Sequence, residues 1–599
     1  MSVKINLAVS SLGLGLLLLT ACFPEENFTP IAEDVLDNVP DSDSLIPTIS
    51  NPEEAADTIY YNGIVITVNR DQPRAEAVAV KDGIITAVGL DDEVLILRGE
   101  QTRLIDLDGT MMLPGFHDVH LHAVEAGINQ NLCFFDPFLP LDAYVDEVAD
   151  CAEFEQRDDP WVLGAGVNMA NLLDQQAFGA GNPIDFLDEA VPDRPVLILD
   201  DIGHGAWANT LAMEAVGYDR LVVNPAGGIV DRDANMKLTG IVLENAQQAL
   251  RTAAFGTNSE NISRGYAALL TSLETLNQNG ITSISDAGGY WTRGHYQIWE
   301  RAVEEDTLTV RASNALYLFP ELDFETQMAE FKRLYTNDPD SLLRFNQAKI
   351  YTDGILSQGT GLLITPYDQI YGLPGVPDGG FPYFDTPSLN RYAQALDAAG
   401  FQLHFHVTGD LATRLSLNAI EQAIEANNTA DARHRLTHLY LVHPADRSRF
   451  AELDVIADFQ LAPSSVDRAY QNDIAELIGT RARDLLPAFD LYDQGATITI
   501  SSDWDADALS PFVKIESILL QDADNVPDLD TIIEWMTINS AYLLHQDEVT
   551  GSIEVGKFAD LVVIDRDITD IPISNISRAR VLLTILEGEE VFRAPAAPE

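Results

Sequence analysis

The feature that most limits how this chain can fold is a regular alternation of short apolar segments with helical segments through its middle. Eight segments have the length and β-branched content of buried strands, and amphipathic stretches such as TRLSLNAIEQAIEAN lie between them. The candidate strands are MMLPGFHDVHLH, ITSISDAG, TVRASNALYL, NQAKIYTDG, FQLHFHVTGD, RLTHLYLVH, VIADFQLAP and ATITISSDWD. Eight strand–helix units predict an α/β fold, a (β/α)8 TIM-like barrel with its active site at the C-terminal ends of the strands.

We place the barrel at residues 113–550, and the other segments form an insertion within it and two flanking ends. The stretch between the first two strands, about residues 125–280, is far longer than one crossover helix and predicts an inserted subdomain over the barrel mouth. Short β-branched runs with NG and DG turn signals occupy residues 57–112, and residues 551–599 have the same character. We expect the two ends to form one small composite β-sandwich domain.

The N-terminus has the pattern of an export signal. Lys4 precedes an apolar run that is too short to span a bilayer, and LTAC follows it. LTAC resembles the bacterial lipobox, which implies a lipoprotein signal peptide at residues 1–21 and a lipid on Cys22. The alternative is an ordinary signal peptide cut nearby. Residues 22–56 are rich in Pro, Ser, Asp and Glu and predict an acidic disordered tether. The expected location is the bacterial cell envelope, on the periplasmic face or the outer membrane, with membrane contact only through this lipid.

Charge and cysteine content restrict the partners. The formal net charge is −59, which repels phosphates and makes nucleic acid an unsuitable partner. A soluble acidic surface explains this charge, and a specific cationic partner is the second explanation. Cys133 and Cys151 are too few for a disulfide scaffold. In an oxidising compartment they could pair with each other, and otherwise they are buried thiols.

The segment LPGFHDVHLH concentrates histidines in a candidate barrel strand. Side chains alternate along a strand, so Asp118, His120 and His122 share one face and His117 has the opposite one. His120 and His122 can hold one ion from one strand, although two unrelated histidines would give the same pattern. Other candidates stand near the ends of other strands, namely Lys349, His406, His438 and Asp503. We expect His117 to pack behind its strand and His404 to lie behind the ligands.

Imidazoles and carboxylates in this arrangement suit a divalent ion such as zinc. A lysine joins such a set only when it is neutral, or when carbon dioxide has converted it to a carbamate that bridges two metals. A bound metal lowers the pKa of water, so hydroxide becomes available near neutral pH. Asp503 could take the proton of the attacking water and then pass it to the departing amine. His204, in the insertion, could hydrogen-bond the developing oxyanion or could be a structural histidine.

Several motifs, in this order, resemble the amidohydrolase superfamily, specifically the amidohydrolase family 3 group of N-substituted formamide deformylase-like proteins. The resemblance covers residues 57–575 and rests on these segments: LPGFHDVHLH, VLILDDIGHGAWAN, GGIVDRDANMKLTGIVLENA, ITSISDAGG, KIYTDG, HVTGD, HRLTHLYLVHP, ISSDWD and GSIEVGKFADLVVID. It implies that His204 faces the substrate and that a homodimer has precedent. The implied cofactor is one or two zinc ions, two being favoured because carboxylated Lys349 would bridge them. The implied metal ligands are His120, His122, Lys349, His406, His438 and Asp503.

Some positions depart from the family pattern. Gly359 stands where an arginine is common, Thr437 where a glutamate is common and Asp505 where proline is usual. These changes concern the pocket rather than the ligands. The resulting hypothesis is a metal-dependent hydrolase that cleaves the C–N bond of a small linear amide, with Asp503 as proton shuttle. The alternatives are a hydrolase or deaminase acting on a cyclic C–N bond, and a non-catalytic binding lipoprotein of the envelope.

Overall fold

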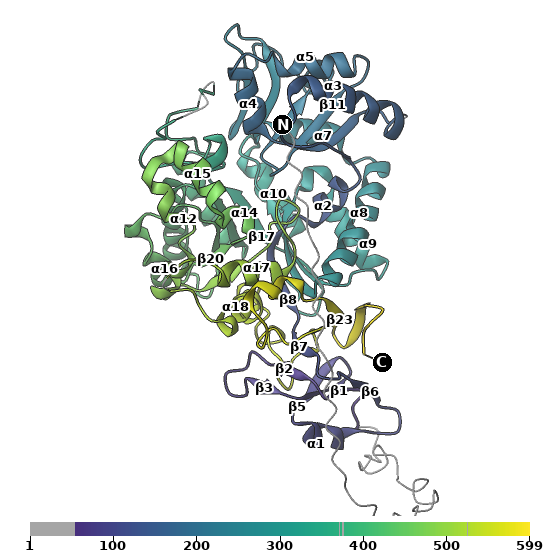
Figure 1. Cartoon of the computed structure of the whole chain (residues 1–599). Coiled ribbons are helices and arrows are strands. Elements are labelled where there is room, and N and C mark those ends of the chain that lie inside the picture. The colour runs from purple at the N-terminus through teal and green to yellow at the C-terminus, as the bar shows by residue number, and fades with distance from the viewer. Residues whose placement is uncertain (1–53, 158, 370–371, 374–375, 524, 599) are drawn as a thin grey trace, which may run out of the picture. The chain divides into compact units, whose positions relative to one another are not determined.

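The computed structural model describes residues 54–598 except 158, 370–371, 374–375 and 524 (Figure 1). The predicted signal peptide, Cys22 and the tether up to residue 53 lie outside these residues. None of the helices in the described part of the chain combines the length and the apolar character that a membrane span needs.

Eight parallel strands form the central sheet, in the order β21-β20-β19-β18-β17-β16-β15-β8, and confirm the predicted TIM-like barrel. The end strands β21 and β8 contact each other, so the barrel is nearly closed. Its strands are β8 (Phe116–Leu121), β15 (Ile281–Gly289), β16 (Arg311–Tyr317), β17 (Leu343–Tyr351), β18 (Gln402–Val407), β19 (Arg435–His438), β20 (Ile456–Phe459) and β21 (Ile498–Ile500). Six of them lie within the predicted segments, while β15 extends beyond its segment at Gly289 and β17 begins before its segment, at Leu343.

Strand β17 shows why these segments become barrel strands. All nine of its residues are buried, as expected for a parallel strand covered on both faces. Ala348 and Ile350 join the large apolar core, whereas Lys349 has the opposite parity. The segments between the strands form the surrounding helices, including α8 (Ser259–Gln278), α9 (His295–Glu304), α10 (Phe324–Leu334), α11 (Thr386–Ala398), α12 (Asp410–Asn427), α17 (Pro511–Leu519) and α18 (Leu529–Met536).

Two further sheets come from the chain ends, one from N-terminal strands alone and the other from strands of both ends, in agreement with the predicted composite domain. One contains β5 (Ile84–Gly89), β4 (Ala77–Lys81), β1 (Thr58–Tyr61) and β6 (Arg103–Asp106), in that order. The other contains β24 (Glu589–Arg593), β23 (Val581–Leu586), β22 (Leu561–Ile564), β7 (Met111–Pro114), β2 (Ile64–Ile66) and β3 (Arg74–Ala75). Apolar side chains from both sheets share one core, for example Val80 with Leu561 and Leu583. The N- and C-terminal strands therefore belong to one β-sandwich.

The predicted strand MMLPGFHDVHLH divides into two. Its first part, β7, pairs antiparallel with β22 of the terminal sheet, and its second part, β8, pairs with β15 of the barrel. Gly115 is the only residue between them. A Cβ atom on Gly115 would lie 2.1 Å from Thr282 Oγ1, so a larger residue would push β8 away from β15. The close contact between Gly115 and Thr282 therefore helps to fix the position of β8 against β15.

The insertion after the first barrel strand forms a sheet of its own, in the order β13-β14-β12-β11-β10-β9. Its strands are β9 (Cys133–Phe134), β10 (Val162–Val167), β11 (Val196–Asp200), β12 (Gly205–Ala208), β13 (Gly228–Arg232) and β14 (Leu238–Glu244). The accompanying helices are α3 (Leu141–Asp150), α4 (Met169–Ala177), α5 (Pro183–Ala190), α6 (Thr210–Ala215) and α7 (Gln247–Ala254). A disulfide joins Cys133 to Cys151, which answers the question left open by the sequence.

Candidate active site

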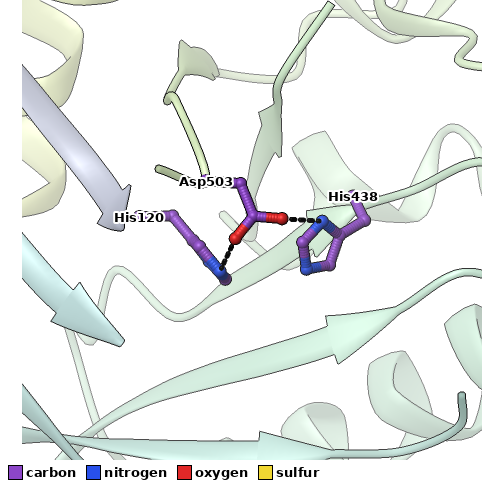
Figure 2. Close-up of side chains that lie close together, drawn as sticks. All are labelled: His120, His438 and Asp503. Carbon is purple, nitrogen blue, oxygen red and sulfur yellow. Dashed lines mark ion pairs between the residues drawn. The ribbon is translucent and has the colours of Figure 1, made fainter. Parts of the chain in front are cut away.

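Three side chains from three strand ends meet at the mouth of the barrel (Figure 2). His120 Nε2 lies 3.2 Å from Asp503 Oδ1, and His438 Nδ1 lies 3.8 Å from Asp503 Oδ2. Within the described residues this is the only group of three or more histidine, cysteine or acidic side chains whose ligand atoms all lie within 4.8 Å of one another. Two imidazoles and a carboxylate are a typical ligand set for zinc.

The other three predicted ligands border this cluster. His122 Nε2 lies 3.4 Å from Asp503 Oδ1. Lys349 Nζ lies 3.1 Å from His120 Nε2. The ring of His406 lies 4.4 Å, centroid to centroid, from that of His438, and its Nε2 lies 3.3 Å from the carbonyl oxygen of Gly354. The structure thus brings all six predicted ligands to one place, with three of them in the tightest group.

Backbone hydrogen bonds join the two ends of the sheet at the site. The amide of Asp503 donates to the carbonyl of His120 at 2.8 Å, and that of His122 donates to the carbonyl of Trp504 at 2.8 Å. The carboxylate of Asp118 accepts from the amide of Ser502 at 3.0 Å. These bonds fix the segment after β21 beside β8 and place Asp503 against the histidines.

Residues behind the ligands orient the rings. His404 Nε2 lies 2.7 Å from His120 Nδ1, and Arg435 lies 2.6 Å from the other nitrogen of His404. Gln460 Oε1 lies 3.0 Å from His438 Nδ1. Supporting groups of this kind set the direction of a ligand ring. His404 therefore lies behind His120, as the sequence predicts.

His117 has a separate environment. It is buried, and its Nδ1 lies 3.1 Å from the carbonyl oxygen of Gly115. Burial lowers the pKa of His117 to about 4, so the ring is neutral near pH 7. It takes no part in the cluster of His120, His438 and Asp503.

Burial controls the protonation of the ligands. It lowers the pKa of His438 to about 3 and that of Lys349 to about 7. It also lowers the pKa of His120, together with the charge of Lys349. Burial acts to raise the pKa of Asp503, but His120 outweighs it and holds that pKa well below its usual range. The site therefore presents neutral imidazoles and an ionised carboxylate, which are the metal-binding forms.

The insertion contributes His204, which lies against the barrel ligands. The rings of His204 and His406 are 4.9 Å apart, and Tyr351 stacks on His406 at 4.3 Å. His204 Nδ1 lies 2.7 Å from Glu244 Oε2. Burial acts to lower the pKa of His204, but the charge of Glu244 outweighs it and raises that pKa.

Glu244 lies at the site and was not predicted from the sequence. It is 1 % exposed and accepts hydrogen bonds from Tyr383 at 2.7 Å and from Thr360 at 2.6 Å, besides its contact with His204. The segment LTGIVLENA contains it and matches the family, but only the folded chain brings Glu244 to His204.

Two cavities meet at this site. One has a volume of about 240 Å³ and the other about 900 Å³. Both are lined by His204, His406, His438 and Asp503. A substrate bound at the cluster therefore has room on two sides.

A model of the amidohydrolase family matches residues 103–592 of this chain. The chain therefore belongs to the amidohydrolase family. Among its relatives is the N-substituted formamide deformylase of Arthrobacter pascens, which is 27% identical over 562 residues, covering 89% of this chain and 97% of the relative. Together with the cluster of His120, His438 and Asp503, this membership defines a metal-dependent hydrolase of the amidohydrolase superfamily.

Solved structures share the fold. An uncharacterized metal-dependent hydrolase from Pyrococcus horikoshii aligns with a TM-score of 0.67 at 18% identity, covering 86% of this chain and 99% of that chain. The zinc complex of the atrazine chlorohydrolase TrzN from Arthrobacter aurescens aligns with a TM-score of 0.51 at 16% identity, covering 90% and 97%.

Proposed function

We propose that this protein hydrolyses the C–N bond of a small linear amide. The observation that carries the proposal is the convergence of His120, His438 and Asp503 at the barrel mouth in a member of the amidohydrolase family. The name of the Arthrobacter pascens relative, an N-substituted formamide deformylase, supports an amide as the substrate class.

The residues present fit zinc as the cofactor. His120, His406 and His438 are buried, and His406 Nδ1 has no hydrogen-bond partner among the described atoms, so a lone pair is available there. The TrzN structure, which contains zinc, supports this metal. A divalent ion held there supplies acidified water and a Lewis acid for the amide carbonyl.

Asp503 is the group that moves the proton. Its carboxylate is ionised and lies between the two imidazoles, so it can accept a proton from the attacking water. An amine is a poor leaving group unless it is protonated, and the same carboxyl can return the proton to the amide nitrogen. One carboxyl thus serves first as base and then as acid.

His204 is placed to bind the carbonyl oxygen. Glu244 holds its Nδ1, so Nε2 is the ring atom left to face the cavities that His204 lines. A raised pKa favours the imidazolium form, which can donate a hydrogen bond to a developing oxyanion.

We further propose that Lys349 is carboxylated and that two zinc ions are bound, with the carbamate between them. Lys349 is fully buried, and its lowered pKa favours the neutral amine, the form that adds carbon dioxide with loss of a proton. His120, His122 and Asp503 would serve one ion, and His406 and His438 the other.

The proposal is tested with the purified, zinc-loaded chain and a set of N-formyl and N-acyl amides, with release of the amine as readout. Asp503→Asn should lower kcat by about 100- to 10,000-fold, the usual contribution of a general acid–base group. Asp522→Asn, at an exposed aspartate, should leave activity unchanged. Release of ammonia without amine would indicate a deaminase, and no turnover of any amide would refute the proposal.

We also propose that the protein works in the cell envelope as a lipoprotein. The LTAC segment supports a lipid on Cys22, and the Cys133–Cys151 disulfide is typical of an oxidising compartment. Metabolic labelling with palmitate should mark the wild-type chain and not Cys22→Ala. Labelling of both chains, or of neither, would refute the anchor.

A further inference from the structure

The smaller of the two cavities has carboxylates in its wall that lack a counter-ion. Asp200, Asp201 and Asp505 line this cavity of about 240 Å³. In the described part of the chain, no lysine or arginine forms an ion pair with any of the three. Asp200 is 6% exposed, and its Oδ1 has no hydrogen-bond partner among the described atoms. A buried carboxylate oxygen without a partner is costly, so a ligand that supplies a donor would stabilise it.

Neutral amides are the partners that these carboxylates do have. Gln358 donates to Asp200 at 3.1 Å, Asn168 to Asp201 at 3.1 Å and Asn129 to Asp505 at 2.9 Å. An amide satisfies a lone pair but supplies no compensating charge. Burial, with the neighbouring charge of Asp201, raises the pKa of Asp200 to about 7, and a cation in the cavity would lower it again.

The arginine in the wall of this cavity already forms an ion pair. Arg251 is the one lysine or arginine among the described residues that line the cavity. It pairs with Glu125 at 3.1 Å, and Glu125 also pairs with Arg293 at 2.8 Å. Glu125 is thus paired with two arginines and His204 with Glu244, which leaves Asp200, Asp201 and Asp505 without a cationic partner of their own among the described residues.

The spacing of Asp200, Asp201 and Asp505 favours an organic cation over a metal ion. In the part of the chain that the structure describes, only His120, His438 and Asp503 bring three candidate ligand atoms within 4.8 Å of one another. Asp200, Asp201 and Asp505 are therefore too far apart to enclose one ion, whereas an ammonium or guanidinium group carries several N–H donors that can reach separate carboxylates.

We propose that the smaller cavity binds an ammonium or guanidinium group of the substrate, so the amide carries a cationic substituent on one side of the scissile bond. This inference rests on the proposed amide hydrolysis and names its substrate class. The other side of the amide enters the cavity of about 900 Å³. That cavity offers apolar and aromatic surface from Phe138, Leu356, Tyr440, Tyr470 and Leu477, although carboxylates such as Asp473 and Glu476 also line it. The net charge of −59 attracts cations and repels anions over the whole surface.

The test compares amides that differ only in one charge, with the zinc-loaded full chain. The probes are the decanoyl amide of putrescine, the isosteric neutral decanoyl pentylamide, and the anionic decanoyl amide of γ-aminobutyrate. A second pair carries the charge on the acyl side: the decylamide of ε-aminocaproic acid ends in an ammonium group, and the decylamide of heptanoic acid ends in a methyl group instead. In one of the two orientations, kcat/KM for the cationic amide should exceed that for its neutral isostere by about 10- to 100-fold, as expected for charged hydrogen bonds.

Variants assign the preference to the cavity wall. Asp200→Asn should reduce the ratio of kcat/KM for the cationic amide to kcat/KM for its neutral isostere by about tenfold. Asp505→Asn provides a second variant if Asp200→Asn fails to fold. The matched control is Glu189→Gln, an exposed acid on α5 of the same insertion, which should keep the wild-type ratio.

The two proposals fail in different ways. Equal turnover of cationic and neutral amides in both orientations overturns the cationic subsite and leaves amide hydrolysis intact. If no amide is cleaved, the proposed function fails, and the subsite is then decided by calorimetry of the same amides with Asp503→Asn. Tighter binding of a cationic amide, weakened by adding Asp200→Asn, supports the subsite, whereas equal binding of cationic and neutral amides overturns it.

Discussion

Glu244→Gln keeps the volume of a buried side chain and removes the charge that holds His204. In the wild type the carboxylate accepts from His204 at 2.7 Å, from Tyr383 at 2.7 Å and from Thr360 at 2.6 Å. A glutamine has one acceptor oxygen and one donor nitrogen, so it must turn its NH2 group toward at least one of these donors. If that donor is His204, the ring loses its partner at Nδ1.

The size of the effect follows from the hydrogen bond that is lost. A hydrogen bond to a charged group contributes about 1.5–3 kcal/mol. At about 1.4 kcal/mol for each factor of ten, kcat/KM should fall by roughly 10- to 150-fold if His204 donates to the carbonyl oxygen in the transition state. His204→Asn should cause a similar fall in kcat/KM. The double variant should be little worse than either single variant, because each substitution removes the same interaction.

The interaction between His204 and Glu244 should also make the stability of the fold depend on pH. The folded-state pKa of His204 is raised, so the pair stabilises the fold fully below the unfolded value of about 6.5 and loses that contribution as the pH rises through the folded pKa. The contribution of this pair, measured as the free energy of unfolding of the wild type minus that of Glu244→Gln, should therefore decrease with pH above about 6.5.

The assays are steady-state amide hydrolysis and urea unfolding from pH 5 to pH 9, with Glu214→Gln on α6 as an exposed control. Two results would refute the reasoning. One is full activity in Glu244→Gln with a folded protein. The other is a double variant whose losses are the sum of the single ones, since His204 and Glu244 would then act independently.

Three further predictions concern the metal and the insertion. The double substitution of Cys133 and Cys151 by serine opens a loop with a sequence separation of 18 and should lower the free energy of unfolding by about 3 kcal/mol, measured in urea without reductant. His438→Ala should reduce bound zinc, measured by elemental analysis, and should reduce the change in Tm caused by a chelator. Lys349→Met should lower zinc content toward half of the wild-type value if a carbamate bridges two ions, and unchanged zinc would exclude the bridge.

The sequence predicts the barrel and the ligand positions well because both depend on local patterns. Each barrel strand is a short buried run, and the interval between runs has the length of a helix. His120, His406 and His438 can be assigned to the site because they stand at strand ends, where parallel strands bring distant residues together. The division of MMLPGFHDVHLH at Gly115 is less accessible, because it depends on the close approach of Thr282.

The substrate side of the site could not be predicted in the same way, because it depends on contacts between the insertion and the barrel. Glu244 ends a strand of the insertion, yet it accepts from Thr360, which follows a barrel strand. Asp200 likewise accepts from Gln358. Residues of this kind have no spacing that marks them. Their positions follow from how two sheets dock, and side-chain periodicity carries no information about that.

Three of the residues at the site have left-handed backbones, so the alternation of side chains along a strand does not set the directions of their side chains. Glu244, His438 and Asp503 have φ values of 56°, 80° and 55°. For residues with a Cβ atom this conformation costs about 1–2 kcal/mol, so surrounding contacts must hold it. The amide of Asp503 donates to the carbonyl of His120, which supplies one such contact. A left-handed residue turns its side chain out of the alternation of its strand. The carboxylate between the two imidazoles is therefore positioned by a turn beyond β21 that hydrogen bonds across the barrel stabilise.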